Sequence, residues 1–387
     1  MSRDDMDKRP AVVHVITQLE LGGAQRNTLH TVANLDKKRF RASLVCGPGG
    51  VLDEEARKLG IPVIFCPALA RPVSPAQDLK AMEEVRNAIA LHHKKTHGQL
   101  VVHTHSSKAG ILGRVAAKRL GARAIVHTVH GFGFHDGQAW AVRQAYQLAE
   151  RAVSGFTDAM IFVSKRDMET AEKLRLVAKD GGHLIRSGID LSAFHPDAEA
   201  RAAVRAELQI PVDAPVVVTV ANFKAQKAPL VGLKAFARVA AELPQAHWVF
   251  VGEGELRAAF DAEAAQLGLT NRIHVLGWRH DVPRILAAGD VSMLSSVHEG
   301  LPRSVLEALS AGLPVAATDA GGTREVVVEG TGQVVPVGDA DALGNAVLTL
   351  LRTPPAVTER ATSLLKEFDI HAMVKQQENI YEWLLSA

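Results

Sequence analysis

Two glutamates, Glu299 and Glu307, stand eight positions apart in a stretch that also carries Arg303. Carboxylates at this spacing either bind a polar ligand together or are ordinary surface charges. Arg303 and Glu307 have the i, i+4 spacing of a helix-surface ion pair, which contributes little to stability. In that second interpretation Glu299 is a solvated loop carboxylate. The surrounding sequence helps to decide between the two.

The segments that flank the two glutamates predict a βαβ unit. An apolar run at 291–294 precedes them. Apolar residues at helical spacing follow from 305 to 309, until Gly312 and Pro314 end the pattern. The next strand is expected at 314–318. The loops of such a unit open at the carboxyl ends of parallel strands, where sheets of this kind bind ligands.

Length and composition are those of a globular protein with two domains. The chain has 387 residues, and one domain holds about 150. Hydrophobic residues make up 47% and charged residues 22%, so a large core can form. The 44 basic and 42 acidic side chains give a net charge of +2, which does not indicate a nucleic-acid-binding protein.

The cysteines and the N-terminal stretch indicate the compartment. Cys46 and Cys66 each end an apolar run, where a buried free thiol is commoner than a disulfide. The charged stretch 1–10 lacks the apolar region of a secretory signal, and no run of about 18 apolar residues occurs. We therefore expect a cytoplasmic protein that does not span the membrane.

Apolar, strand-like runs alternate with helical stretches through the first half of the chain, which predicts an α/β fold with a doubly wound parallel sheet. The runs lie at 12–16, 42–45, 62–65, 100–103, 124–128 and 159–163. A glycine pair, Gly22 and Gly23, follows the first run and precedes a helical pattern. The pair is either a plain tight turn or a place where backbone N–H groups meet a phosphate or a sugar hydroxyl.

Histidines cluster around two of these predicted strands, at His103, His105, His127, His130 and His135. A zinc site is one interpretation, but no cysteine or acidic ligand stands at a conventional spacing and there is no HExxH motif. In the other interpretation His103, His105 and His127 are ordinary core or loop histidines. The segment that carries His130 combines glycines with aromatic residues, which predicts a mobile loop able to close on a sugar face.

The second half of the chain begins with an apolar strand at 216–220, after which Lys224 and Lys227 follow. These lysines are either solvated or bind a phosphate, where a charge-assisted hydrogen bond contributes about 1.5–3 kcal/mol. A Gly-x-Gly sequence at 252–254 also follows a strand-like run. It does not match a dinucleotide fingerprint, because the third glycine would fall at Arg257.

The whole string from Glu299 to Val326 resembles the signature of the family 4 retaining glycosyltransferases, and its two glutamates match the EX7E pair of that family. The resemblance implies the GT-B fold, in which two Rossmann-like, doubly wound parallel-sheet domains face a cleft and the C-terminal helix crosses back to the first domain. We therefore expect an acceptor-side domain at 1–192, completed by a helix at 370–387. We expect a linker at 193–211 and a nucleotide-sugar-binding domain at 212–369.

The resemblance also implies roles for individual residues. Its catalytic positions correspond to His130, Glu299 and Lys227. The donor-binding positions correspond to Gly22, Gly23, Asn222, Gly252, Glu253, Arg279, Gly300, Leu301, Pro302, Arg303 and Glu307. Glu299 would orient sugar hydroxyls and Glu307 would hold the ribose. The chain departs from the family at Asn222, where relatives carry a phosphate-binding arginine, and either Lys224 or Arg303 is the candidate replacement.

The implied function is retaining, metal-independent transfer of a sugar, with a nucleotide-sugar, UDP-sugar favoured, as co-substrate and no other cofactor. The acceptor would be a glycan or a lipid-linked molecule of bacterial cell-surface polysaccharide or glycolipid synthesis. Two other functions stay open: a nucleotide-sugar epimerase of the same fold, and a non-catalytic sugar-binding protein. The donor sugar, the base, the acceptor, the linkage and the oligomeric state are not readable from the sequence.

A basic segment at 92–97 closes a predicted helix that begins near residue 81. Positive charge at a helix C-terminus interacts favourably with the helix dipole, which is the simpler interpretation. The alternative is peripheral contact with anionic lipid headgroups at the cytoplasmic face of the inner membrane.

Overall fold

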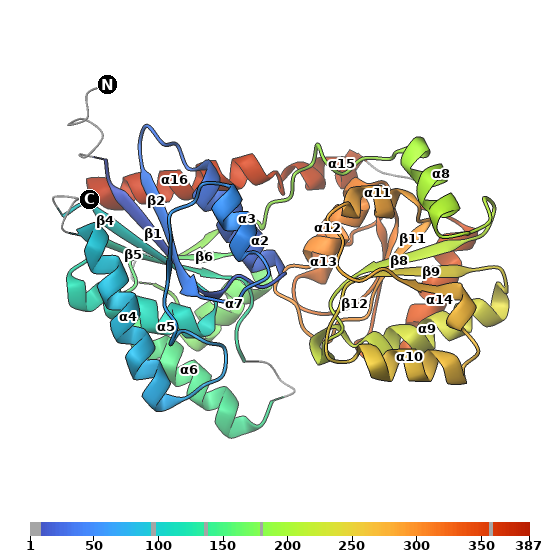
Figure 1. Cartoon of the computed structure of the whole chain (residues 1–387), viewed down its shortest axis with the longest axis horizontal. Helices are drawn as coiled ribbons and strands as arrows, with labels where there is room; N and C mark the ends of the chain where they lie inside the picture. Colours follow the sequence, from blue (N-terminus) through green and yellow to red (C-terminus); the bar gives the residue numbers. More distant parts are fainter. Residues whose placement is uncertain (1–8, 94–97, 135–137, 179–180, 356–358) are drawn as a thin grey trace. The chain divides into compact units, whose positions relative to one another are not determined.

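The computed structural model describes residues 9–93, 98–134, 138–178, 181–355 and 359–387 (Figure 1). These residues form two compact units. The first unit contains the described residues up to Gly188 together with Ile370–Ala387, and the second contains Ile189–Asp369. No helix in the described part of the chain combines the length and the apolarity needed to cross a bilayer.

The first unit is built on a seven-stranded parallel sheet in the order β3-β2-β1-β4-β5-β6-β7. Its strands are β1 (Ala11–Gln18), β2 (Arg41–Gly47), β3 (Val63–Phe65), β4 (Leu100–His105), β5 (Ala124–Val129), β6 (Ala159–Phe162) and β7 (Gly182–Leu184). Its helices are α2 (Gly23–Asn34), α3 (Asp53–Lys58), α4 (Pro75–His93), α5 (Ser107–Leu120), α6 (Trp140–Ser154), α7 (Lys165–Leu174) and α16 (Ile370–Ser386). The strand order reverses between β1 and β4, which makes their carboxyl ends the switch point of the sheet.

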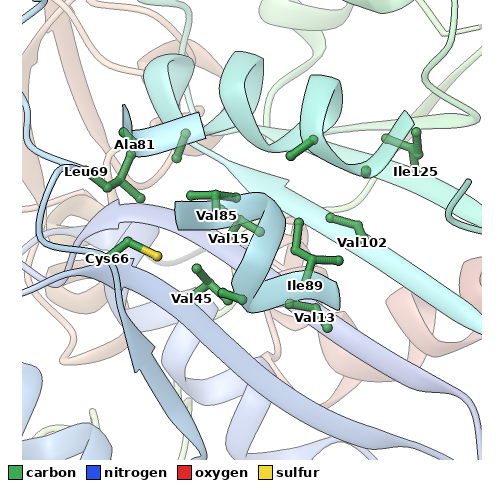
Figure 2. Close-up of a cluster of buried hydrophobic side chains, with 14 of the residues drawn as sticks. Val13, Val15, Val45, Cys66, Leu69, Ala81, Val85, Ile89, Val102 and Ile125 are labelled. Atoms are coloured by element: carbon green, nitrogen blue, oxygen red, sulfur yellow. The ribbon is translucent and has the colours of Figure 1, made fainter. Parts of the chain in front are cut away.

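Helices cover both faces of this sheet, which explains why its central strands β1, β4 and β5 are buried along almost their whole length. On one face α4 and α5 pack against alternate residues of β1 and β4. Figure 2 shows Val85 and Ile89 of α4 lying over Val13, Val15 and Val102. On the other face α16 packs against β1, β4 and β5 and contacts α2.

The second unit is built on a six-stranded parallel sheet in the order β10-β9-β8-β11-β12-β13. Its strands are β8 (Val216–Val220), β9 (His247–Val251), β10 (Ile273–Val275), β11 (Val291–Leu294), β12 (Val315–Thr318) and β13 (Gly332–Val335). Its α-helices are α8 (Ala198–Glu207), α9 (Pro229–Glu242), α10 (Arg257–Gln266), α11 (Val282–Ala287), α12 (Arg303–Ser310), α13 (Thr323–Val326), α14 (Ala340–Arg352) and α15 (Glu359–Lys366), with short 3₁₀ turns η1 (Ala225–Lys227) and η2 (Thr270–Arg272). The strand order reverses between β8 and β11.

The predicted α/β architecture with two doubly wound parallel sheets is confirmed, and the C-terminal helix belongs to the first unit as expected. The division falls after Gly188 rather than after residue 192. The segment 193–211, expected as a linker, is instead part of the second unit. Its helix α8 packs on α11, and the guanidinium of its buried Arg205 donates to the Asp290 carboxylate at 2.9 Å.

Candidate active site

Two loops of the second unit meet at the switch point of its sheet. One follows β8 and carries Lys227, and the other follows β11 and carries Glu299. Because β8 and β11 are neighbours in the sheet, Lys227 and Glu299 meet at this edge although they are 72 positions apart in the sequence. The Val297 N–H donates to the Gln226 carbonyl at 2.8 Å, and the Gln226 side chain donates to the His298 carbonyl at 2.8 Å. The two loops therefore form one surface.

Lys227 and Glu299 form an ion pair on this surface between the lysine ammonium and the glutamate Oε1. The hydroxyl of Ser296 donates to the same Glu299 oxygen at 2.6 Å. The Ser295 hydroxyl donates to the Lys227 carbonyl at 2.9 Å. Glu299 is only 6% exposed, and Lys227 and Ser296 supply hydrogen bonds to its buried carboxylate. Lys227 and Glu299, predicted as neighbours at one ligand site, are brought together.

Arg303 and Glu307 also form a pair, 3.3 Å apart, on the first turns of α12. Their side chains are only 13% and 12% exposed, so this is not a fully solvated surface pair. The helix-surface ion pair that the i, i+4 spacing predicts between Arg303 and Glu307 is therefore present. Binding of a ribose by Glu307 and of a phosphate by Arg303 stays a prediction.

A glycine from the next strand-to-helix loop fixes the backbone of Glu299. Gly321 has φ +56°, and a Cβ built on it would lie 1.7 Å from the Glu299 carbonyl oxygen. The neighbouring Gly322 N–H donates to the Gly300 carbonyl at 2.8 Å. The loop after β12 thus closes tightly on the Glu299–Gly300 segment, and only glycine fits there.

Replacing Gly321 with Ala is expected to move the Glu299 loop and to lower the rate of sugar transfer at least tenfold. The added methyl group overlaps a backbone oxygen that cannot move without the loop. Steady-state rates and the melting temperature of the second unit measure the effect.

Gly338→Ala is the matched control, because Gly338 has φ +82° but no neighbour within 4 Å. It should cost about 1–2 kcal/mol of stability and leave the rate unchanged. Equal rates for the two variants would contradict this account.

Asn222, Gly252 and Glu253 lie beside one another at the ends of β8 and β9. Gly252 has φ +145°, and a Cβ on it would lie 1.9 Å from the Ala221 carbonyl oxygen. The Phe223 N–H donates to the Glu253 carbonyl at 3.0 Å. Glycine at 252 is therefore required for the close approach of two loops. Whether this turn also contacts a donor stays a prediction.

Arg279 has its guanidinium occupied by protein carboxylates. It forms two bonds to Asp281, at 2.7 and 2.8 Å, and one to Glu207 at 3.2 Å. The Arg279 hydrogen bond lowers the pKa of Asp281 to about 2. These contacts give the Arg279 side chain a role in joining α8 to the loop before α11. Its predicted donor contact stays untested.

The glycine pair of the first unit begins helix α2 at the carboxyl end of β1. Gly22 precedes the helix with φ −166°, an extended conformation that any residue adopts. The backbone therefore does not require glycine at this position. The prediction that Gly22 and Gly23 expose N–H groups to a ligand stays open.

His130 follows β5 and belongs to a cluster of histidines in the interior of the first unit. His103, His105 and His127 are buried in β4 and β5, as expected for core histidines. His14 was predicted as part of the first strand but not as a member of the histidine cluster; it lies on β1 directly opposite His103 in the strand register. A small cavity of ≈ 10 Å³, enough for about one water molecule, borders His105 and His130. His135 and residues 94–97 of the basic segment lie outside the described residues.

Burial keeps His14, His103, His105 and His127 uncharged at neutral pH. It lowers the pKa of His14 to about 3. It also lowers the pKa of His103, His105 and His127 well below 6.5. An unfolded chain therefore binds more protons than the folded unit once the pH falls below about 6.5. Stability must fall as the pH drops through this range.

The thermal midpoint of the first unit is accordingly expected to decrease from pH 7 to pH 5. Each buried histidine contributes a slope of about 1.4 kcal/mol per pH unit. His14→Asn should reduce this slope by the contribution of one histidine, about 1.4 kcal/mol per pH unit, because asparagine does not titrate. Thermal unfolding of both proteins across this range measures the difference. Identical slopes for the two proteins would show that His14 does not titrate on unfolding.

Two family descriptions match this chain, one in each unit. "Glycosyl transferase 4-like domain" matches residues 22–188, and "Glycosyl transferases group 1" matches residues 214–353. Together they cover the Gly22–Gly23 turn, the His130 loop and both glutamates.

Individual proteins agree with the family descriptions. The chain is 32% identical over 345 residues to the UDP-Gal:alpha-D-GlcNAc-diphosphoundecaprenol alpha-1,3-galactosyltransferase of Escherichia coli, covering 87% of each protein. It is 30% identical over 250 residues to the GDP-mannose-dependent alpha-(1-6)-phosphatidylinositol monomannoside mannosyltransferase of Mycolicibacterium smegmatis, covering 62% of this chain and 63% of that protein.

Solved structures of the same fold match nearly the whole chain. Anabaena Alr3699/HepE in complex with UDP and glucose matches with a TM-score of 0.82 at 20% identity, covering 97% of this chain and 100% of that one. Sucrose-phosphate synthase from Thermosynechococcus elongatus matches with a TM-score of 0.80 at 22% identity, covering 98% and 100%. The two family models, the relative from Escherichia coli and the shared fold together show that this chain belongs to the family 4 glycosyltransferases of the GT-B fold.

Proposed function

We propose that this glycosyltransferase moves a sugar from a UDP-sugar to a lipid-linked glycan, with retention of configuration and without a metal ion. The relative from Escherichia coli, named for a UDP-galactose donor and a diphosphoundecaprenol-linked acceptor, supports this choice of donor and acceptor. A lipid-linked acceptor would bring the enzyme to the cytoplasmic face of the membrane as a peripheral protein.

The observation that carries the proposal is the Lys227–Glu299 pair at the switch point of the second sheet. A diphosphate leaving group gains negative charge as the glycosidic bond breaks, and the Lys227 ammonium is the group that would stabilise it. Glu299 would then exchange its lysine partner for hydroxyl groups of the sugar, which donate to carboxylates. Donor binding thus replaces one satisfied ion pair by two ligand contacts.

Retention without a protein nucleophile requires that attack and departure occur on the same face of the sugar. In this proposal the departing phosphate oxygen accepts the proton of the acceptor hydroxyl. The protein supplies orientation and charge stabilisation and excludes water from the reacting groups. Glu299 and Glu307 therefore act as ligand-binding groups and not as an acid/base pair.

The test is transfer by purified protein from a panel of UDP-sugars and GDP-mannose to polyprenyl-diphosphate-linked N-acetylhexosamine. We expect UDP release that depends on the acceptor and persists in EDTA, and a product with the anomeric configuration of the donor by NMR. Absence of nucleotide release from every donor would refute transferase activity. A new sugar isomer formed from the donor alone would identify an epimerase instead.

A further inference from the structure

Three imidazoles form a hydrogen-bonded chain that ends at His130. His14 Nδ1 lies 3.0 Å from His105 Nε2, and His105 Nδ1 lies 3.2 Å from His130 Nε2. The rings of His14 and His105 are within 6° of parallel. The three residues come from β1, from the end of β4 and from the position after β5, which are neighbours in the sheet.

The direction of one hydrogen bond in this chain fixes the direction of the next. A neutral imidazole has one N–H donor and one lone pair. If His105 Nε2 accepts from His14, then His105 Nδ1 must carry the proton and donate to His130. If His105 Nε2 donates instead, His130 must donate to His105. The chain therefore has only two states, one pointing toward His130 and one pointing away from it.

The inner end of the chain favours the state that points toward His130. His14 is fully buried, and its Nε2 has no hydrogen-bond partner among the described residues. In the state that points toward His130, the His14 proton is on Nδ1 and Nε2 carries only a lone pair. In the state that points away from His130, the proton is on Nε2, which is then a buried N–H group without an acceptor. Buried N–H groups without an acceptor are rarer in proteins than acceptors without a donor.

We propose that His105 is a positioning residue, held by His14 in the form that donates from Nδ1, which keeps His130 in its Nδ1-protonated tautomer. Free histidine in water prefers the proton on Nε2, so the protein imposes the less common tautomer. His130 is then a hydrogen-bond donor from Nδ1 and cannot act as a base there. The role of His130 in the reaction rests on the proposed function: its Nδ1–H group would donate a hydrogen bond to an oxygen of the sugar.

A metal ion is the competing explanation for the same histidines. One ring nitrogen each of His14, His103 and His105 lies within 4.8 Å of the others. Both nitrogens of His103, however, are bonded to hydroxyl groups, at 2.6 Å to Tyr381 and 2.7 Å to Thr128. Both nitrogens of His105 are bonded to other histidines. Metal binding would have to break several of these bonds, and no carboxylate belongs to the group.

The experiment reads the tautomer of His130 directly from long-range ¹H–¹⁵N correlations of ring nitrogens in the full-length protein at pH 7.5. We expect protonated Nδ1 in wild-type His130. His105→Leu removes the donor and should shift His130 toward the Nε2-protonated form. His105→Asn is the matched rescue, because its amide nitrogen stands one bond from Cγ, as Nδ1 does, and should restore the wild-type tautomer. The wild-type spectrum decides the direction of the chain even if a variant does not fold.

Kinetics form the second arm. His105→Leu should lower kcat about tenfold with little change in the KM for the donor, and His105→Asn should recover most of the loss. Nε2-protonated His130 in the wild type, or one tautomer in all three proteins, overturns the inference. The inference is also overturned if the purified wild-type protein contains one equivalent of a divalent metal and the His105→Asn variant does not. If no donor supports transfer, the proposed function fails while the tautomer result stands.

Discussion

Lys227→Met is expected to lower kcat/KM for the nucleotide-sugar about a hundredfold. The variant removes a charge-assisted hydrogen bond of about 1.5–3 kcal/mol to the leaving diphosphate, and each 1.36 kcal/mol corresponds to about a factor of ten. It also leaves Glu299, which is 6% exposed, without its cation and with the Ser296 hydroxyl as a hydrogen-bond donor. Initial rates of UDP release at several donor concentrations measure the loss.

Lys234→Met is the matched control for this variant. Lys234 lies on α9 of the same unit, its side chain is 65% exposed, and it pairs only distantly with Glu263, at 4.0 Å. The change in charge is the same, but a solvated pair of this kind contributes little. The control should keep the wild-type rate. If Lys227→Met stayed within threefold of the control, the assignment of Lys227 to the diphosphate would have to be abandoned.

Arg114→Met is expected to destabilise the first unit by about 3–5 kcal/mol, because it leaves a buried carboxylate without its cation. Arg114 of α5 is 0% exposed, and its guanidinium donates to the Glu150 carboxylate of α6 at 2.5 Å. Its Nε donates to the Gly110 carbonyl at 2.9 Å. Urea unfolding followed by a probe in the first unit measures the change.

The double variant Arg114→Met/Glu150→Leu distinguishes the cost of an unpaired buried charge from the cost of lost packing around Arg114. Replacing both charges by apolar groups of similar size removes the cost of an unpaired buried charge, so most of the lost stability should return. Arg86→Met is the surface control, since Arg86 and Glu83 form an exposed pair on α4. Stability that stayed equally low in the double variant would show that the guanidinium matters through packing and not through Glu150.

Much of the fold was predictable because the central strands are buried on both faces. The apolar runs at β8 and β11 have the predicted bounds, Val216–Val220 and Val291–Leu294. Of the four edge strands, β3 was predicted from the apolar run at 62–65, but β7, β10 and β13 were missed. These three are three or four residues long, and each contains a polar residue or a glycine that interrupts the apolar run.

The candidate site was only partly predictable, because its contacts depend on strand order. Lys227 and Glu299 were singled out separately by motif, but their pairing requires β8 beside β11. His14 lay within a predicted strand and gave no signal of its own, since its partner His105 lies 91 residues away. The role of Gly321 depends on a backbone approach that no spacing reveals.

The contact between Tyr381 of α16 and His103 of β4 has a consequence for synthesis of the chain. The core of the first unit includes Ile380 and Tyr381, so that unit lacks part of its interior until these residues have left the ribosome. The second unit is one continuous segment and can fold earlier. The first unit should therefore be the later of the two to reach its native state, since it contains a contact between residues 278 positions apart.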